Sequence, residues 1–305
     1  KEGGRKMAQE ATSTMNKKKN KFTIGKFLNY FFLTVLAFIC LYPFLNVVAY
    51  SFSGYNAVLS GKVTFYPIDI SLTAYQTIMK NSQIWSAMWV TIFTTIMGTL
   101  IGLILTIAAA YALSRDYLPG KGILSGLILF TMYFSGGIIP TFLVVKGLGM
   151  YDSLTSLFIP QAVNVFNFIV MRTFFRQLPT ELEEAARIDG ANEMQILFKI
   201  ILPLSVPIIA TIGLFYAVNY WNSYFDALIY ITSPDKFTLQ LRLRNLLFAD
   251  ELANAGGNGE GIGTQVMSQS LKMCCVVVAT LPIICVYPWL QKYFVKGVML
   301  GSVKG

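Results

Sequence analysis

Histidine is absent from this 305-residue sequence, and charged residues make up only 13% of it. Without histidine, the chain has no imidazole for acid–base catalysis, for a proton relay or for binding a metal ion. A soluble domain would carry about 25% charged residues, whereas 55% of this chain is hydrophobic. These shortages exclude most catalytic schemes, and they predict an integral membrane protein with no catalytic residue and no metal site.

Cysteine is scarce as well, and none of the four copies has the spacing of a redox or zinc motif. They lie inside apolar runs, where we interpret them as small packing residues. A Walker A pattern is also missing, which argues against a phosphate-binding loop. The net charge of +9 comes from basic residues in the N-terminal tail and between apolar runs. Because these residues are not interleaved with aromatic side chains, we expect no nucleic-acid partner.

Six apolar runs are long enough to cross the roughly 30 Å hydrocarbon core of a lipid membrane. They cover residues 27–53, 85–114, 122–145, 154–174, 204–231 and 273–295. The third run should be irregular near Gly136-Gly137 and Pro140, where backbone groups need protein partners. The sequence therefore predicts an all-α, polytopic membrane protein with six transmembrane helices. Residues 27–296 form its transmembrane domain, between a basic tail over residues 1–26 and a short tail over residues 297–305.

The distribution of lysine and arginine predicts the orientation of these spans. Seventeen of these residues fall on one side of the membrane and seven on the other, counted over the tails and loops. The side with more positive charge is normally cytoplasmic. Both termini are therefore expected in the cytoplasm, together with the loop over residues 176–203. Residues 232–272 form a long loop on the outer side.

The segment over residues 181–207 has the local chemistry of a helical hairpin. Thr180 and Glu183 have the spacing of a capping box, and acidic residues fill the first turn. Asp189-Gly190 should interrupt the helix, because glycine accepts a left-handed backbone without steric penalty. A second helix then continues toward Pro203. On these residues alone, a docking element and an ordinary amphipathic loop are equally good interpretations.

A resemblance to a known family favours docking. The run EAARIDGA over residues 184–191, with Leu202-Pro203 beyond it, resembles the EAA loop of permease subunits in binding-protein-dependent ABC importers. The six-span layout and the run over residues 292–305 are similar to the carbohydrate-importing branch, especially the inner permeases of oligosaccharide or polysaccharide importers and the smaller maltose permease. The chain departs from the family pattern at Leu197, where an aromatic residue is usual; Phe198 follows it.

The resemblance implies a type I ABC importer permease fold and an ATP-driven sugar importer of the cytoplasmic membrane of a prokaryote. The chain itself would bind no cofactor, because ATP and Mg belong to the partner ATPase. Its implied partners are a homologous second permease subunit, two ABC ATPase chains and an extracytoplasmic sugar-binding protein. The residues that the resemblance assigns to ATPase coupling are Glu183, Glu184, Ala185, Ala186, Asp189, Gly190, Ala191, Leu197, Phe198 and Pro203.

Polar residues in the fifth run suggest a path for the sugar. Tyr216, Asn219, Ser223 and Asp226 recur at intervals of three or four residues, which predicts one polar face on a continuous helix. Aromatic rings can cover the C–H faces of a sugar, while amides and carboxylates bind its hydroxyl groups. The predicted substrate-pathway residues are Tyr216, Asn219, Tyr220, Trp221, Asn222, Ser223 and Asp226. Hydrogen bonding between helices of the bundle is the alternative role for these residues.

The long outward loop contains a glycine-rich run. In the resembled family, this loop reaches toward the substrate-loaded binding protein, and a plain flexible linker is the alternative. The residues predicted to contact the binding protein are Asn254, Gly256, Gly257, Asn258, Gly259 and Glu260.

Two rival functions follow from other physical arguments. An ion-coupled secondary transporter would need ionisable groups near the middle of the membrane, but Asp226 is the only carboxylate inside a predicted span. A membrane enzyme would need a nucleophile, metal ligands or paired carboxylates. Glu183 and Glu184 are adjacent in sequence and would diverge on a helix, so they form a poor acid–base pair.

Overall fold

The computed structural model describes residues 24–246, 269–286 and 288, and the regular elements of this part are helices. The described part also contains one isolated antiparallel bridge, between Ser53 and Ile70. The predicted all-α class is therefore confirmed. Most of the predicted N-terminal tail over residues 1–26 and all of the tail over residues 297–305 lie outside the described residues.

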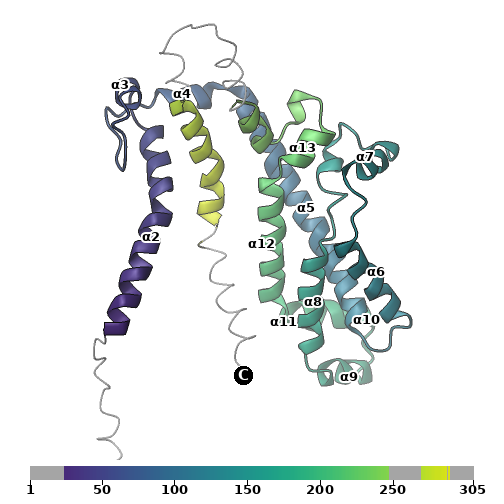
Figure 1. Cartoon of the computed structure of the whole chain (residues 1–305). Coiled ribbons are helices and arrows are strands. Elements are labelled where there is room, and N and C mark those ends of the chain that lie inside the picture. Colours follow the sequence, from purple (N-terminus) through teal and green to yellow (C-terminus); the bar gives the residue numbers. More distant parts are fainter. Residues whose placement is uncertain (1–23, 247–268, 287, 289–305) are drawn as a thin grey trace, which may run out of the picture.

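The labelled helices follow one another along the chain, with a short loop or a bend between neighbours (Figure 1). A further helix, Gln269–Val286, makes up the second described stretch. The labelled elements are α2 (Ile24–Ser51), α3 (Tyr55–Leu59), α4 (Thr73–Lys80), α5 (Ser82–Ser114), α6 (Lys121–Tyr133), α7 (Ile138–Gly147), the 3-10 helix η1 (Leu154–Leu157), α8 (Val165–Gln177), α9 (Glu181–Ile188), α10 (Glu193–Ile196), the π-helix η2 (Leu197–Ile201), α11 (Leu202–Leu204), α12 (Val206–Asn222), α13 (Phe225–Tyr230) and the 3-10 helix η3 (Pro234–Lys236).

Three helices of the described part are long and apolar enough to cross a membrane: α2, α5 and Gln269–Val286. Two bent pairs raise the number to five if each pair forms one span. The pair α6 and α7 is bent by 117°, and the stretch Glu193–Leu204 meets α12 at 82°. The bend between α6 and α7 confirms the predicted irregularity, because Gly137, directly before α7, has φ +89°. The predicted fourth run becomes η1 and the 13-residue α8, and neither meets this length.

The core is built on α5, which packs most extensively against α12 and α8. Gly98 and Gly102 of α5 make room for two aromatic rings of α12. A Cβ atom added at Gly98 would lie 2.6 Å from the Tyr220 ring, and one added at Gly102 would lie 3.0 Å from the Tyr216 ring. The two helices therefore approach each other as closely as glycine allows.

In Figure 1, the long helices run between two ends of the molecule. The short helices α9 and α10 lie at one end of α5, α8 and α12, and α13 lies toward the other. Helix α2 stands apart from this bundle, and its apolar window has no buried residue. Near the end of α2, Ala49 belongs to a small cluster with Ala57, Val58 and Val63.

Candidate functional site

The hairpin consists of α9, a tight turn and α10. Gly190 adopts φ +81° at the turn, a left-handed conformation that glycine takes without the clash of a Cβ atom. Asn192 then caps α10: its side chain accepts a hydrogen bond from the backbone of Gln195, and the Gln195 side chain bonds back. The sequence prediction of a helix, a glycine turn and a second helix is confirmed.

The predicted capping box at the start of α9 is wrong. Thr180 has helical backbone angles and makes no side-chain capping bond. Glu183 instead turns into the protein, where its exposed fraction is only 3%, and forms an ion pair with Arg115 at 2.5 Å. The Arg115 side chain is also buried and lies over the ring of Tyr111. A buried carboxylate needs an opposite charge beside it, and Arg115 supplies that charge to Glu183.

A second cluster joins the two arms of the hairpin to the chain around the end of α5. The carboxylate of Glu193 accepts hydrogen bonds from the hydroxyl groups of Tyr111 and Tyr117, each at 2.9 Å. Arg187 lies between the arms, 3.0 Å from Glu193 and 3.6 Å from Glu183. The hairpin is thus held by charged and polar side chains from both of its helices.

The two carboxylates of this cluster differ in their pKa shifts. Burial raises the pKa of Glu183, an effect that Arg115 and Arg187 only partly oppose. Burial also disfavours the charged form of Glu193, but hydrogen bonds from Tyr111, Tyr117 and Arg187 outweigh it and lower its pKa. Glu193 is therefore held as an anion between donors.

The hairpin and the π-helix η2 that follows it carry exposed apolar side chains. Ile188 is 86% exposed, Met194 62% and Phe198 60%, although all three belong to a segment rich in charge. Apolar side chains left exposed in a charged segment are candidates for contact with another protein. The hairpin lies at one end of α5, α8 and α12 (Figure 1).

The predicted coupling residues divide into three groups. Glu183 and Leu197 are buried and face the chain's own core. Ala186 and Ala191 are partly buried against the same core. The remaining predicted residues are exposed or form the turn itself: Glu184, Ala185, Asp189, Gly190, Phe198 and Pro203.

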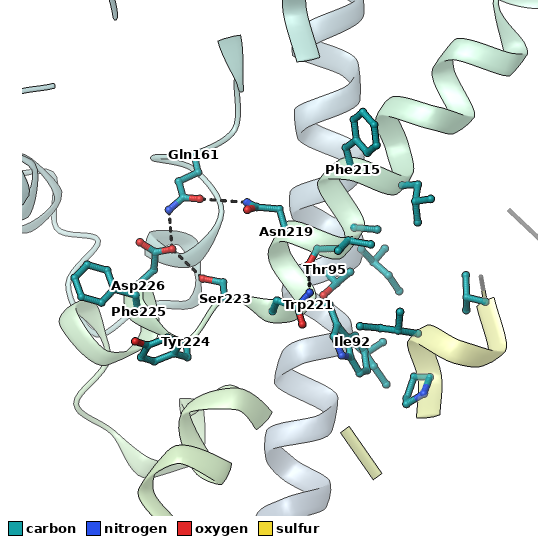
Figure 2. Close-up of a pocket in the computed structure, with 18 residues that line it drawn as sticks. Ile92, Thr95, Gln161, Phe215, Asn219, Trp221, Ser223, Tyr224, Phe225 and Asp226 are labelled. Atoms are coloured by element: carbon teal, nitrogen blue, oxygen red, sulfur yellow. Dashed lines mark hydrogen bonds between the residues drawn. The ribbon is translucent and has the colours of Figure 1, made fainter. Parts of the chain in front are cut away.

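A cavity of about 1010 Å³ lies in the part of the molecule away from the hairpin, between α5, α12, α13 and Gln269–Val286. Its walls include Ile92, Thr95 and Ile96 of α5, aromatic residues of α12 and α13, and Pro282. The lining is mostly apolar, with polar groups concentrated around the end of α12. Figure 2 shows this grouping.

The polar groups form one hydrogen-bonded chain (Figure 2). Gln161 donates to the carboxylate of Asp226 at 2.6 Å and accepts from Asn219 at 3.4 Å. The Ser223 hydroxyl donates to the same Asp226 oxygen at 2.9 Å. Two amides, a hydroxyl and a carboxylate thus converge beside the rings of Tyr224 and Phe225. This combination can hydrogen-bond the hydroxyl groups of a sugar and cover its C–H faces.

The prediction that Tyr216, Asn219, Ser223 and Asp226 share one face of a continuous helix is wrong. Helix α12 ends at Asn222, Ser223 adopts an extended backbone, and Asp226 lies in the first turn of α13. The break is stabilised locally, because the Ser223 hydroxyl bonds the Asp226 carboxylate three residues later. Tertiary contacts and not helical spacing bring Asp226 to Asn219.

Three predicted pathway residues bond within the bundle. Tyr216 bonds the Thr106 hydroxyl at 2.7 Å, and Tyr220 donates to the carbonyl groups of Phe158 and Gln161. The indole of Trp221 donates to the carbonyl of Ala279. All three rings are buried, so their hydroxyl and N–H groups serve the alternative role, hydrogen bonding inside the bundle. Asn222 lines the cavity and donates to Val218.

The residues predicted to contact the binding protein, Asn254, Gly256, Gly257, Asn258, Gly259 and Glu260, lie outside the described residues.

Some residues of the site escaped the sequence analysis. Arg115, Tyr111 and Gln161 are far in sequence from the groups they bind, and no periodic pattern connects them. Ile188 could have been found, because it is a large apolar residue beside the predicted glycine turn.

Comparison with known proteins agrees with this geometry. Residues 121–300 match the family model of the binding-protein-dependent transport system inner membrane component. The polygalacturonan/rhamnogalacturonan transport system permease protein YtcP of Bacillus subtilis is 46% identical over 278 residues, which cover 91% of this chain and 97% of that protein.

Solved structures show the same fold. One chain of a bacterial ABC transporter that imports the acidic polysaccharide alginate superposes with a TM-score of 0.82 at 35% identity, covering 91% of this chain and 99% of that chain. A chain of the bacterial alginate ABC transporter in complex with its pentasaccharide-bound periplasmic protein superposes with a TM-score of 0.55 at 14% identity, over 87% of this chain and 92% of that chain. The second likeness supports the fold alone.

Proposed function

The chain belongs to the family of binding-protein-dependent transport system inner membrane components, and from this premise we propose how it works. It is the permease subunit of an ATP-driven importer that carries an oligosaccharide or a polysaccharide fragment across the cytoplasmic membrane of a prokaryote. Six spans with both termini in the cytoplasm form its transmembrane domain. The chain performs no chemistry, and a separate ATPase hydrolyses ATP with Mg.

The hairpin is the observation that carries this proposal. Ile188, Met194 and Phe198 are exposed, and the hairpin lies at the end of the bundle where the lysine and arginine distribution predicts cytoplasm. A pair of ATPase chains would receive the hairpin in a cleft. When ATP closes the ATPase dimer, the hairpin moves with it, and rigid-body rotation of the helices alternates access between the two sides.

The cavity supports a saccharide as the cargo. Hydroxyl groups of a sugar would bond Asp226, Gln161 and Asn219, and the rings of Tyr224 and Phe225 would cover its C–H faces. A homologous second permease would complete the path, and an extracytoplasmic binding protein would deliver the saccharide. The polygalacturonan/rhamnogalacturonan and alginate systems among the relatives point to a long, hydroxyl-rich substrate.

An ion-coupled secondary transporter is not favoured. The family model and the solved relatives belong to binding-protein-dependent or ABC systems, and Asp226 is already hydrogen-bonded to Gln161 and Ser223.

A pull-down with the partner ATPase tests the docking surface. We expect Ile188→Ser to weaken ATPase association by about tenfold, because fully burying an isoleucine side chain contributes about 1.5–3 kcal/mol. The matched control is Ile70→Ser, which makes the same change at a 74% exposed isoleucine in the loop between α3 and α4. Equal recovery of the ATPase with both variants would remove Ile188 from the docking surface.

A further inference from the structure

The hairpin is attached to the end of α5 and the turn that follows it by two separate sets of contacts, one for each arm. Glu183 of α9 pairs with Arg115 at 2.5 Å, and both side chains are more than nine-tenths buried. Glu193 of α10 accepts hydrogen bonds from Tyr111 and Tyr117, each at 2.9 Å. We name these five residues, together with Arg187, the hairpin clamp.

The clamp resists rotation of the hairpin. A single contact would let the hairpin pivot, but two contacts on different arms fix its angle relative to α5. Arg187 joins the two sets, because its guanidinium lies 3.0 Å from Glu193 and 3.6 Å from Glu183 and also over the ring of Tyr117. Pivoting would separate buried charges from their partners, which proteins avoid.

The other part of α5 forms a wall of the cavity. Ile92, Thr95 and Ile96 line it, and Gly98 and Gly102 hold α5 directly against the rings of Tyr220 and Tyr216. One uninterrupted helix, Ser82–Ser114, therefore extends from the clamp to the cavity. A rigid helix that carries both features transmits a tilt at one end to the other.

We propose that the hairpin clamp makes the hairpin and α5 one rigid body, so that Arg115, Tyr111 and Tyr117 are positioning residues that convert ATPase movement into movement of the cavity wall. This inference rests on the proposed function. It adds a mechanical connection that the docking surface alone does not require, since a docked hairpin could also move while α5 stays in place.

The test uses the complete importer in proteoliposomes, with saccharide uptake and ATP hydrolysis measured in the same preparation. We expect Glu183→Gln and Arg115→Gln to lower the amount of saccharide taken up per ATP by about fivefold or more, the lower end of the usual coupling between linked sites. Hydrolysis continues, because the ATPase chains are unchanged. Arg115→Lys keeps the positive charge, so its saccharide uptake per ATP should stay close to that of the unmodified importer.

A milder variant covers the case in which a buried charge change prevents assembly. The double variant Tyr111→Phe with Tyr117→Phe removes two hydroxyl groups and keeps both rings. Its uptake per ATP should fall while the complex keeps its subunit composition and its ATP hydrolysis, a combination that a failure to fold or assemble would not give. Tyr133→Phe is the matched control, since this 85% exposed tyrosine lies at the end of α6.

The outcomes separate the two proposals. If the unmodified importer shows no ATP-dependent uptake, the proposed function is wrong and the clamp has no role to explain. If it transports normally and the assembled clamp variants keep the same uptake per ATP as the Tyr133→Phe control, the proposed function stands and the clamp inference is overturned. If the charge variants fail to assemble, the uptake per ATP of the double tyrosine variant tests the clamp inference in their place.

Discussion

Replacing Gly98 with alanine tests the packing that positions α5 against α12. The added Cβ atom would lie 2.6, 2.7 and 2.8 Å from three carbons of the Tyr220 ring, whereas carbon atoms in contact prefer about 3.5–4.0 Å. The ring would have to retreat by roughly 1 Å to restore this contact distance. Its hydroxyl opposes that movement, because it bonds the carbonyl groups of Phe158 and Gln161, each at 3.2 Å. Overpacking of this kind costs about 1–3 kcal/mol.

The matched control is Gly126→Ala in α6, where an added Cβ atom meets nothing within 4 Å. Both substitutions gain the same helix propensity, about 1 kcal/mol, so the difference between them isolates the clash. Unfolding of the purified variants in detergent, followed by tryptophan fluorescence, should show Gly98→Ala less stable than Gly126→Ala by about 1–3 kcal/mol. Equal stability of the two variants would refute the close approach of α5 and α12.

Three further predictions concern other parts of the molecule. Gly190→Val should impair uptake without affecting membrane insertion, because a Cβ atom at φ +81° costs about 1–2 kcal/mol. Gly190→Asn is the control and should be tolerated. Normal uptake by the valine variant would contradict the role of the turn. Asp226→Asn should lower uptake several-fold at unchanged ATPase association; uptake equal to that of the unmodified chain would contradict a place for this carboxylate on the path. Hydrogen bonds from Ser233 and Thr232, with Lys236, lower the pKa of Asp152. The ionised Asp152 carboxylate therefore stabilises the fold fully above its pKa in the unfolded chain, about 3.9, and this stabilisation is lost as the pH falls below that value. Asp152→Asn should accordingly lower the melting temperature at pH 7 more than at pH 3. An equal difference at the two pH values would contradict this assignment.

Local chemistry predicted the hairpin well. The left-handed turn at Gly190 and the break near Gly137 both follow from the conformational freedom of glycine. This property can be read from one position of the sequence. The apolar runs around α2 and α5 were equally clear, because their length and composition are local properties. Features of this kind can be predicted from one sequence.

Tertiary contacts determined the features of the site that the sequence did not predict. Glu183 has the sequence position of the acidic partner in a capping box with Thr180, but it pairs instead with Arg115, 68 residues earlier. The polar spacing of the fifth run suggested one helical face, whereas the bond from Ser223 to Asp226 stabilises a break in the helix. Gln161 comes to Asp226 from a loop with no recognisable motif. Periodicity within one segment contains no information about such distant partners.

Transport of a saccharide by this chain should require a separate ATPase. Affinity purification of the chain from its own membranes in mild detergent, followed by an ATPase assay of the product, tests this requirement. We expect that a second permease and an ATPase co-purify, and that hydrolysis rises when the saccharide-loaded binding protein is added. Recovery of a lone protein from a preparation that retains other membrane complexes, with uptake that survives ATP depletion under an ion gradient, would contradict it.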